Sequence, residues 1–360
     1  MINRVPQVLL QRPQINLARS TTTRMVIVSV CAGLGILQSS LTDSFTSLGL
    51  AFAATAAALV AEFVINRMTG TRTLRDGSAV TSALVLTLLL PNQINPLLAA
   101  LGAVFAIAVV KQSFGGLGAN WLNPALGGWL FVRFAWPGPF EKALMGVSHT
   151  GIRVSEEILT FFGSLDGNIT GFLNTTIFAL TGSELPEGYI NFLFSLAPSI
   201  VADRGLLGLL LGTVIIAASQ IGRVWIAPLF LGVYIILVRF FGALPGFILN
   251  TDLIRTMPKI ALLEEGLGKG DILYGFFSGG IIAAAFLLAV EPASGTKTRT
   301  GALIVAFLGG VFTFFFQYRG GEPYGAFFAV AVLNLLTPVI RSIERRIFHN
   351  SIPNEAGRPL

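Results

Sequence analysis

The chain has 360 residues, of which 53% are hydrophobic and 12% are charged, and its mean hydropathy is +0.75. So few charged residues exclude an ordinary soluble globular protein of this size. The apolar runs lack the alternation of outer-membrane β-strands, so we expect an all-α integral membrane protein in the lipid bilayer. The net charge of +6 lies beside these runs, where it indicates membrane topology, and we expect no nucleic acid partner.

The first 24 residues contain four arginines and no acidic residue. By the positive-inside rule, this composition places residues 1–24 in the cytoplasm. The segment is mostly polar and lacks a small-residue cleavage site, so we expect no cleaved signal peptide. The single cysteine, Cys31, lies in the apolar run that follows, which excludes a disulfide framework and a thiolate cluster for metal ligation. Any redox cofactor is therefore expected to be organic or to belong to a partner.

About ten transmembrane helices are predicted from the apolar segments. These segments lie near 25–44, 47–66, 78–91, 96–111, 123–136, 205–221, 224–241, 272–290, 301–317 and 324–340. The segments 78–91 and 123–136 are shorter than the about 20 residues that span the hydrocarbon core, and Gly or Pro bounds them. Such segments are typical of broken half-helices that end at membrane depth beside a cavity, a cofactor or an ion.

The basic residues follow the topology that a cytoplasmic start dictates. Each loop predicted to be cytoplasmic contains at least one of them: Arg67, Arg72 and Arg75; Lys111; Arg223; and Lys297 and Arg299. The tail at 341–360 is also basic, whereas acidic residues outnumber basic ones in the connection at 137–203. We therefore predict a protein of the inner (cytoplasmic) membrane with both termini in the cytoplasm and an extracytoplasmic connection at 137–203.

The two halves of the chain resemble each other. GSAVTSALVLTLLLP at 77–91 is similar to SGGIIAAAFLLAVEP at 278–292, and the same offset relates Pro137 to Pro338. We predict two five-helix repeats at 25–136 and 204–340, which must be inverted because five is an odd number of crossings. The alternative is a chance similarity between apolar segments that contain Gly and Pro.

The short segments also contain the candidate cofactor-binding residues. Asp76 precedes a short helix, where a carboxylate caps free amides with a contribution of about 1 kcal/mol, and we favour this role. The functional alternative is that the helix starts at Gly77 and Asn123 direct partial positive charge at an anionic ring, a phosphate or a quinone oxygen. Gly115 and Gly116 are expected to form a tight re-entrant turn that allows close approach to a planar ligand.

Four charged residues near segment ends have ordinary explanations. We expect Lys111 to extend to the membrane interface. Arg133 lies near the outer end of its segment and is expected to pair with an acidic residue of 137–203. Glu291 and Glu322 precede prolines and are expected to be interfacial caps, with binding of a translocated cation as the alternative.

Four blocks of the sequence are similar to the shared signature of the NqrB/RnfD membrane subunits. They are LRDGSAVTSALVL, KQSFGGLGANWLNPALGGWLF, EPASGTKTRTGALI and GEPYGAFFAVAVLNLLTPVI, in order and in both halves. These subunits belong to the sodium-translocating NADH:quinone oxidoreductase and the Rnf ferredoxin:NAD oxidoreductase. The resemblance implies ten helices in an inverted repeat similar to the urea-transporter fold.

Members of that family carry FMN esterified to a threonine of a Ser-x-Ala-Thr type motif after the fifth helix. The corresponding stretch, DGNITGFLNTTIF at 166–178, lacks the motif and has Phe172 at the attachment position. The nearby hydroxyls that a shifted alignment would use are Thr170, Thr175 and Thr176. A second family block is also degraded, to PSIVADRG at 198–205. FMN, riboflavin and a quinone are the candidate cofactors, and we predict no covalent FMN.

The resemblance implies a membrane subunit of an Rnf/Nqr-like ion-translocating electron-transfer complex. Such a chain houses or neighbours a flavin, forms part of the cation path and has the other subunits as partners. With no soluble nucleotide-binding or iron–sulfur domain in the sequence, it is not expected to oxidise NADH or ferredoxin unaided. The alternative is a flavin-less family member that acts as a scaffold, a channel or a transporter on the same fold.

Overall fold

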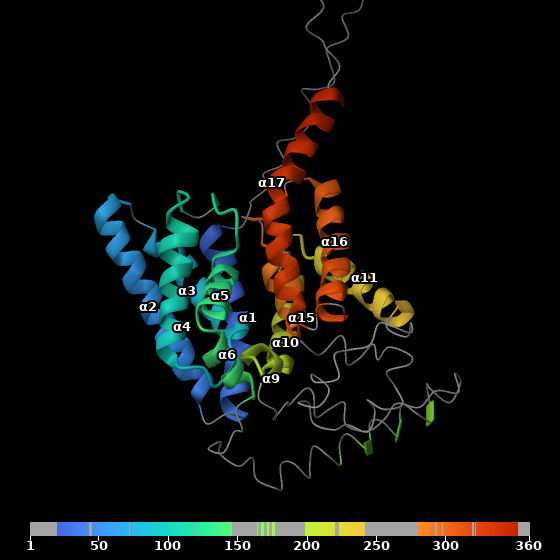
Figure 1. Ribbon diagram of the computed structural model, residues 1–360, viewed down its shortest axis with the longest axis horizontal. Helices are drawn as coiled ribbons and strands as arrows, with labels where there is room; N and C mark the ends of the chain where they lie inside the picture. Colours follow the sequence, from blue (N-terminus) through green and yellow to red (C-terminus); the bar gives the residue numbers. More distant parts are fainter. Residues whose placement is uncertain are drawn as a thin grey trace, which may run out of the picture.

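The computed structural model describes most of the apolar segments of the chain. The described residues are 20–42, 45–71, 73–116, 118–145, 164, 167–168, 171–172, 175–176, 199–219, 223–241, 280–291, 294–296, 298–318, 320 and 322–351. All regular elements among them are helices, as predicted (Figure 1).

Each of the predicted apolar segments contains a helix. In chain order the elements are α1 (Thr21–Thr42), α2 (Thr46–Thr69), η2 (Leu74–Asp76), α3 (Ser78–Leu89), α4 (Pro96–Phe105), the π-helix η3 (Ala106–Gln112), α5 (Pro124–Ala135), α6 (Pro137–Met145), α9 (Val201–Arg204), α10 (Leu206–Ala218), α11 (Ile226–Phe241), α15 (Ile281–Ala283), the π-helix η6 (Ala284–Leu288), α16 (Arg299–Tyr318) and α17 (Gly325–Ser351). Among the described helices, four contain stretches long and apolar enough to cross a membrane: Thr21–Leu41, Thr46–Thr69, Arg299–Gln317 and Gly325–Glu344. The chain is therefore a multi-pass, all-helical membrane protein.

Local sequence explains where the shorter helices begin. The side chain of Asn95 accepts a hydrogen bond of 2.9 Å from Leu97 N, and Asn123 accepts one of 3.2 Å from Leu126 N. In both cases a proline follows at the first helical position, where its missing N–H leaves no bond unmade. The helix α3 instead begins after Gly77, whose φ of 75° is left-handed and suits glycine.

The two halves of the chain meet where α1 crosses α10. A Cβ atom added to Gly208 of α10 would lie 2.3 Å from Leu34 O, and one added to Gly212 would lie 2.8 Å from the Cβ of Cys31. The thiol of Cys31 also donates a hydrogen bond of 3.0 Å to Gly212 O. Small residues therefore let the two backbones touch, which is how helices associate in a membrane without a hydrophobic driving force.

A second contact between the halves closes the end of α3. Leu90 O accepts a hydrogen bond of 3.0 Å from Val201 N, and Asn92 N donates one of 3.1 Å to Ser199 O. Pro91 and Ile200 form an isolated antiparallel bridge between these bonds. The chain around Ile200 thus satisfies two of the backbone groups that are left free at the end of the short helix.

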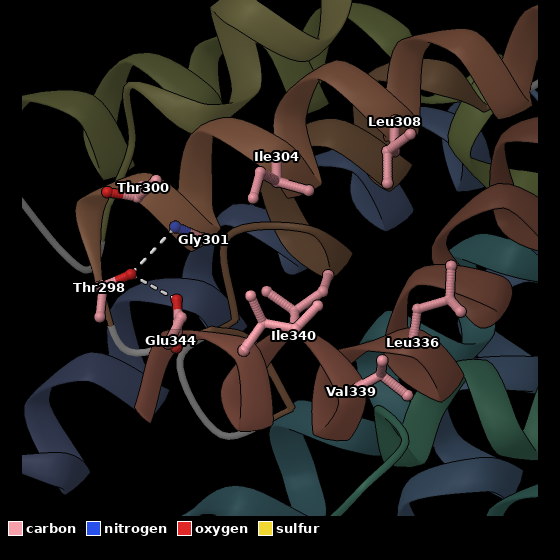
Figure 2. A pocket seen from close by; sticks show the side chains of 10 residues that line it. Thr298, Thr300, Gly301, Ile304, Leu308, Leu336, Val339, Ile340 and Glu344 are labelled. Atoms are coloured by element: carbon pink, nitrogen blue, oxygen red, sulfur yellow. Dashed lines mark hydrogen bonds between the residues drawn. The ribbon is translucent and has the colours of Figure 1, made fainter. Parts of the chain in front are cut away.

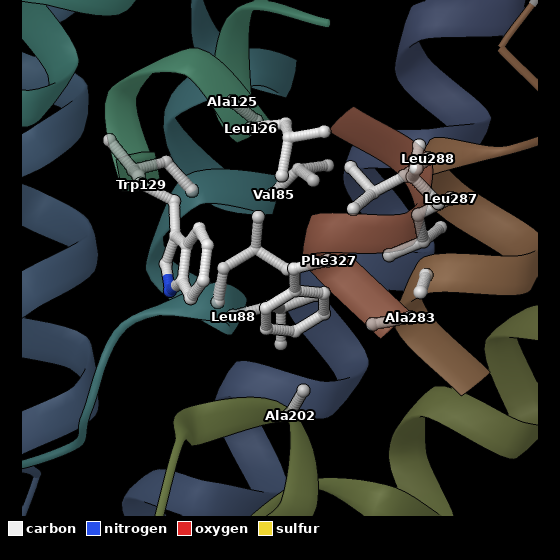
Figure 3. Packing of buried hydrophobic residues seen from close by; sticks show 14 of the residues in the cluster. Val85, Leu88, Ala125, Leu126, Trp129, Ala202, Ala283, Leu287, Leu288 and Phe327 are labelled. Carbon is white, nitrogen blue, oxygen red and sulfur yellow. The ribbon is translucent and has the colours of Figure 1, made fainter. Parts of the chain in front are cut away.

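Apolar side chains from α3, in the first half of the chain, and from η6, in the second half, share one core. Figure 3 shows Val85 and Leu88 of α3 in the same cluster as Leu287 of η6, with Trp129 and Phe327 beside them. The rings of Trp129 and Phe327 meet edge to face at 5.1 Å. The core therefore joins the first half of the chain to the second.

Helices α16 and α17 pack against each other along most of the length of α16. Helix α17 continues beyond the predicted end of its apolar segment near residue 340. The helix passes through Pro338 and ends at Ser351. Directly before the proline, the hydroxyl of Thr337 donates a hydrogen bond of 2.9 Å to Leu333 O. Such side-chain bonds help a membrane helix to tolerate proline.

Candidate functional site

A buried ion pair lies between α2 and η3. Lys111 Nζ is 2.5 Å from Glu62 Oε1, and the two side chains are 0% and 1% exposed. Glu62 belongs to an apolar helix that is long enough to cross a membrane. Charged groups inside membrane helices are unfavourable unless they are paired, and they commonly mark ion or proton pathways.

A chain of hydrogen bonds connects this ion pair to the start of α3. Lys111 Nζ donates to Ser78 Oγ at 2.5 Å, and Ser78 Oγ donates to Asp76 Oδ1 at 2.5 Å. Asp76 Oδ1 also accepts a bond of 2.8 Å from Ser78 N, so its predicted capping role is confirmed. The candidate residue Asp76 therefore belongs to a polar cluster, and Gly77 lies beside it. We call it the Glu62 cluster: Glu62, Asn66, Thr73, Asp76, Ser78, Lys111 and Gln112.

The two carboxylate oxygens of Glu62 have unequal surroundings. Oε1 accepts hydrogen bonds from Lys111 Nζ, from Thr73 Oγ1 at 2.6 Å and from Gln112 Nε2 at 3.4 Å. Oε2 is buried and has no hydrogen-bond partner among the described residues, and the same holds for Nδ2 of Asn66 nearby. A buried polar atom without a partner is unfavourable and commonly indicates an unseen water, ion or ligand.

The prediction that Lys111 extends to the membrane interface is wrong. Its side chain is fully buried because Glu62 and Ser78 hold the ammonium inside the bundle. Lys111 lies in the π-helix η3, whose wider turns shift the register of the residues after Ala106. Glu62 was not among the sequence candidates, although a single carboxylate in the apolar helix α2 was a signal for it.

A second polar group joins the two halves at the same end of the bundle. Asn123 Nδ2 donates a hydrogen bond of 2.6 Å to Glu291 Oε2, which also accepts one of 3.2 Å from Ser294 Oγ. Both amide atoms of Asn120, which is 1% exposed, are buried without a partner among the described residues. The predicted start of a helix at Asn123 is thus next to a carboxylate and an unsatisfied amide.

The glycines of the loop between η3 and α5 form a tight turn, in keeping with the sequence. Gly115, Gly116 and Gly118 have φ values of 98°, 87° and 96°, which only glycine adopts without strain. Gly116 N donates a hydrogen bond of 3.1 Å to Lys111 O, so the turn is built onto the end of η3. It lies toward the top of Figure 1, as does the C-terminal part of α17.

The opposite end of the bundle carries Arg133. Its guanidinium is 3.1 Å from Glu141 and 3.8 Å from Glu322, so the predicted pairing with an acidic residue of the connection is confirmed. Arg133 also lies over the ring of Phe140 at 5.3 Å. Glu322 belongs to the second half, so this ion pair again joins the two halves.

The threonines proposed for flavin attachment have a simpler role in the described part of the chain. Thr175 Oγ1 donates to Gly171 O at 2.8 Å, and Thr176 Oγ1 donates to Phe172 O at 2.5 Å. Both side chains and Phe172 are exposed. Thr170 lies outside the described residues.

A pocket of about 310 Å³ lies between α16 and α17 and is mostly apolar. Figure 2 shows its polar end, where the hydroxyl of Thr298 donates to Glu344 and accepts a bond of 3.0 Å from Gly301 N. The hydroxyl group thus links the start of α16 to α17. Arg341 of α17 donates to Gly295 O, which fixes the loop before α16.

Comparison with known proteins assigns the chain to a family. Over 277 residues the chain is 29% identical to a subunit of the Na(+)-translocating ferredoxin:NAD(+) oxidoreductase complex of Acetobacterium woodii, and the match covers 77% of this chain and 74% of that relative. It is 28% identical over 350 residues to a subunit of the ion-translocating oxidoreductase complex of Erwinia tasmaniensis, covering 91% and 94%. With a subunit of the proton-translocating ferredoxin:NAD(+) oxidoreductase complex of Clostridium ljungdahlii the identity is 27%, covering 79% and 78%. The NQR2, RnfD, RnfE family model matches residues 8–349, and the chain therefore belongs to this family.

Proposed function

We propose that this chain is the membrane subunit of an ion-translocating electron-transfer complex and forms part of its cation path. Each of the three relatives is the subunit designated D in a complex that is named for translocating sodium ions, protons or ions in general. The observation that carries the proposal is the buried Glu62–Lys111 ion pair inside an apolar helix bundle. The other subunits of the complex and the lipid bilayer are the proposed partners.

An inverted arrangement of the two halves is part of the proposal. Two pairs of helix contacts support it: α2 packs on α4 as α11 packs on α16, and α4 packs on α5 as α16 packs on α17. The start of α15 at Gly280 is bonded to Asp203, close to the chain that pairs with the end of α3. The region after η6, at Glu291, meets Asn123 at the end of the bundle that carries Lys111. These contacts favour opposite directions for the two short helices, and we propose with them ten crossings and repeats at 25–136 and 204–340. The basic residues of the N-terminal segment and the C-terminal tail support the proposed cytoplasmic termini in the inner membrane.

The absence of covalently attached FMN is a further part of the proposal. Phe172 cannot form a phosphoester, and the hydroxyls of Thr175 and Thr176 are used in bonds to backbone carbonyls. The amide of Asn120 fits a non-covalent ligand better, because its buried donor and acceptor lack partners among the described residues. We propose that FMN, riboflavin or a quinone is held there by Asn120, close to the helix start at Asn123; a bound group of this kind would take up and pass on electrons.

The experiment that tests this function uses a tagged, full-length chain in its native membrane. We expect it to co-purify with redox-active subunits, and inverted vesicles that lack it are expected to lose ion uptake driven by electron transfer. If the chain purifies without such subunits, the alternative function holds, namely a scaffold, a channel or a transporter without flavin. The lack of a threonine at the flavin attachment position favours the same alternative. Mass spectrometry of the purified complex and a sodium or proton flux assay distinguish these results.

A further inference from the structure

We propose that the pocket between α16 and α17 binds one acyl chain of an anionic phospholipid from the cytoplasmic leaflet, with Arg299 beside the lipid phosphate. This inference goes beyond the proposed function, because it concerns a lipid and neither the translocated ion nor an electron carrier. The leaflet follows from the proposed topology, in which the start of α16 and the tail after residue 340 are cytoplasmic.

The pocket lies within two helices that are long and apolar enough to cross a membrane. All of its lining residues except Thr298 fall in the membrane-length stretches of α16 and α17. Its apolar side chains include Ile304, Val339 and Ile343, which are 40%, 55% and 51% exposed. Because lipid surrounds helices of this kind, a groove lined by exposed apolar side chains opens to hydrocarbon and not to water.

The length of the pocket matches one leaflet of a bilayer. Along α16 it extends from Thr298 to Leu308, and along α17 it extends from Leu336 to Glu344. At 1.5 Å per residue these stretches rise by about 15 Å and about 12 Å, compared with about 15 Å for half of the hydrocarbon core. The volume of about 310 Å³ is at the lower end of the range for ligand pockets, so it suits one slender chain and not a complete lipid.

The pocket is polar at one end and apolar at the other. Figure 2 shows Thr298 and Glu344 at the polar end and Leu308 and Leu336 at the apolar end. The two leucines also pack against a small buried cluster of apolar side chains: Val305, Leu333 and Ile340. An acyl chain that enters from the polar end therefore ends against apolar side chains, in the same order as a lipid in its leaflet.

Arginines from three parts of the chain lie at the polar end of the pocket. Arg299 is the first residue of α16 and is exposed. Arg223, from the loop before α11, donates a hydrogen bond to Thr298 O, and Arg341 of α17 donates one to Gly295 O. Basic groups between membrane helices on the cytoplasmic side attract phosphate headgroups. The charge at this end therefore favours an anionic lipid over a zwitterionic one.

The acidic residue at this end, Glu344, does not cancel that charge. Its side chain is buried and accepts a hydrogen bond from the hydroxyl of Thr298. The carboxylate lies so close to α16 that a Cβ atom added to Gly301 would overlap it. Three arginines and one glutamate leave this end net positive, and Arg299 is the arginine that is exposed to a headgroup.

The test is a lipid titration of the purified full-length chain by native mass spectrometry, with phosphatidylglycerol and phosphatidylcholine of identical acyl chains. We expect wild type to bind one phosphatidylglycerol at least about tenfold more tightly than phosphatidylcholine. R299Q should weaken the binding of phosphatidylglycerol about fivefold, because each basic residue near the surface contributes an attraction of this order. R75Q is the matched control, since Arg75 is exposed and lies outside the pocket.

A second pair of variants tests the pocket itself. V339F places a ring in the groove and should weaken the binding of both lipids by at least about tenfold. L335F is its matched control, because Leu335 of the same helix is 56% exposed and does not line the pocket. A phosphatidylglycerol with a photoreactive diazirine midway along one chain should label 304–308 or 336–340 in wild type and in L335F, but not in V339F.

Three results would overturn the inference. The first is equal lipid binding by V339F and L335F, since the pocket would then hold no acyl chain. The second is equal affinity of wild type for the two lipids, since the arginines would then select no headgroup. The third is a crosslink from position 339 to a helix of another subunit in the purified complex, because a protein would then cover the groove. If V339F does not fold, the comparison of R299Q with R75Q and the position of the photolabel in wild type decide the question.

Discussion

Asp203 accepts a hydrogen bond of 2.8 Å from the backbone amide of Gly280, at the start of the second short helix. In the first half, Asp76 accepts a bond of the same length from Ser78 N at the start of α3. Gly77 and Gly280 both have a left-handed φ, of 75° and 63°. Each short helix thus begins with a glycine turn and a carboxylate on a free amide, although the first aspartate is adjacent in sequence and the second comes from α9.

Replacing Asp203 should reveal the contribution of this bond. We expect D203A to lower the stability of the chain by about 1–2 kcal/mol, because the amide of Gly280 loses its acceptor. D203N retains a side-chain oxygen and should lose less. Thermal unfolding in detergent measures both, and equal melting of D203A and D203N would contradict the assigned role of the oxygen.

The buried ion pair should behave differently from the exposed one. We expect E62Q and K111M each to destabilise the chain by about 3–5 kcal/mol, since each leaves an uncompensated buried charge, and E62Q/K111M to recover most of the loss. The matched double-mutant cycle uses R133Q and E141Q. Loss of this ion pair should lower the free energy of unfolding by no more than about 1 kcal/mol, because Glu141 is half exposed. Additive losses at Glu62 and Lys111, measured by thermal unfolding, would show that the two side chains are not coupled.

The crossing of α1 and α10 should not accept a methyl group at Gly208. A Cβ there would lie 2.3 Å from Leu34 O, so G208A is expected to destabilise the chain by about 1–3 kcal/mol. G33A is the matched control on α1, because a Cβ at Gly33 meets nothing within 4 Å. Size-exclusion chromatography and thermal unfolding compare the two. Normal folding of G208A would mean that the helices are not in backbone contact.

No covalent flavin is expected on the purified chain. Phe172 occupies the position at which related subunits are expected to carry the ester, and Thr175 and Thr176 are bonded to their own helix backbone. Flavin fluorescence in a denaturing gel, followed by mass analysis of the peptide at 166–178, measures the modification. A fluorescent band with an FMN-sized mass increment on Thr170, Thr175 or Thr176 would refute the prediction.

The proposed topology can be checked by labelling single cysteines from each side of the membrane. C31S is a suitable background, because a serine hydroxyl can still donate to Gly212 O. We expect a cysteine at Thr71, which is exposed, to react from the cytoplasmic side. A cysteine at Thr160, outside the described residues, should react from the other side. Labelling of both from one side would invalidate the arrangement.

Much of the fold was predictable because membrane helices are defined by local composition. The short helix at 78–91, the cap at Asp76 and the glycine turn at Gly115 all depend on neighbouring residues, and all were confirmed. The partner of Arg133 was predicted only as a class of residue, since an unpaired arginine on the outer side requires an acidic neighbour.

The polar site could not be predicted in the same way, because its contacts are between distant residues. Lys111 was expected at the interface, as a long charged side chain at the end of an apolar segment ordinarily is. The side chain of Lys111 is buried instead, because the π-helix shifts the register of the chain and because Glu62 approaches from α2. Local sequence reveals neither feature. The orphaned amide of Asn120 likewise becomes visible only once the helices are packed.

The backbone bonds that close α3 have a consequence for the order of synthesis. Leu90 O and Asn92 N pair with Val201 N and Ser199 O, which the ribosome adds only after the whole connection has been made. Unpaired peptide groups are unfavourable in lipid, so the end of α3 needs temporary partners during insertion, such as water or the translocation machinery. The first five helices are therefore not an autonomous insertion unit, and a nascent chain that stops before residue 199 should remain associated with the machinery that inserts it.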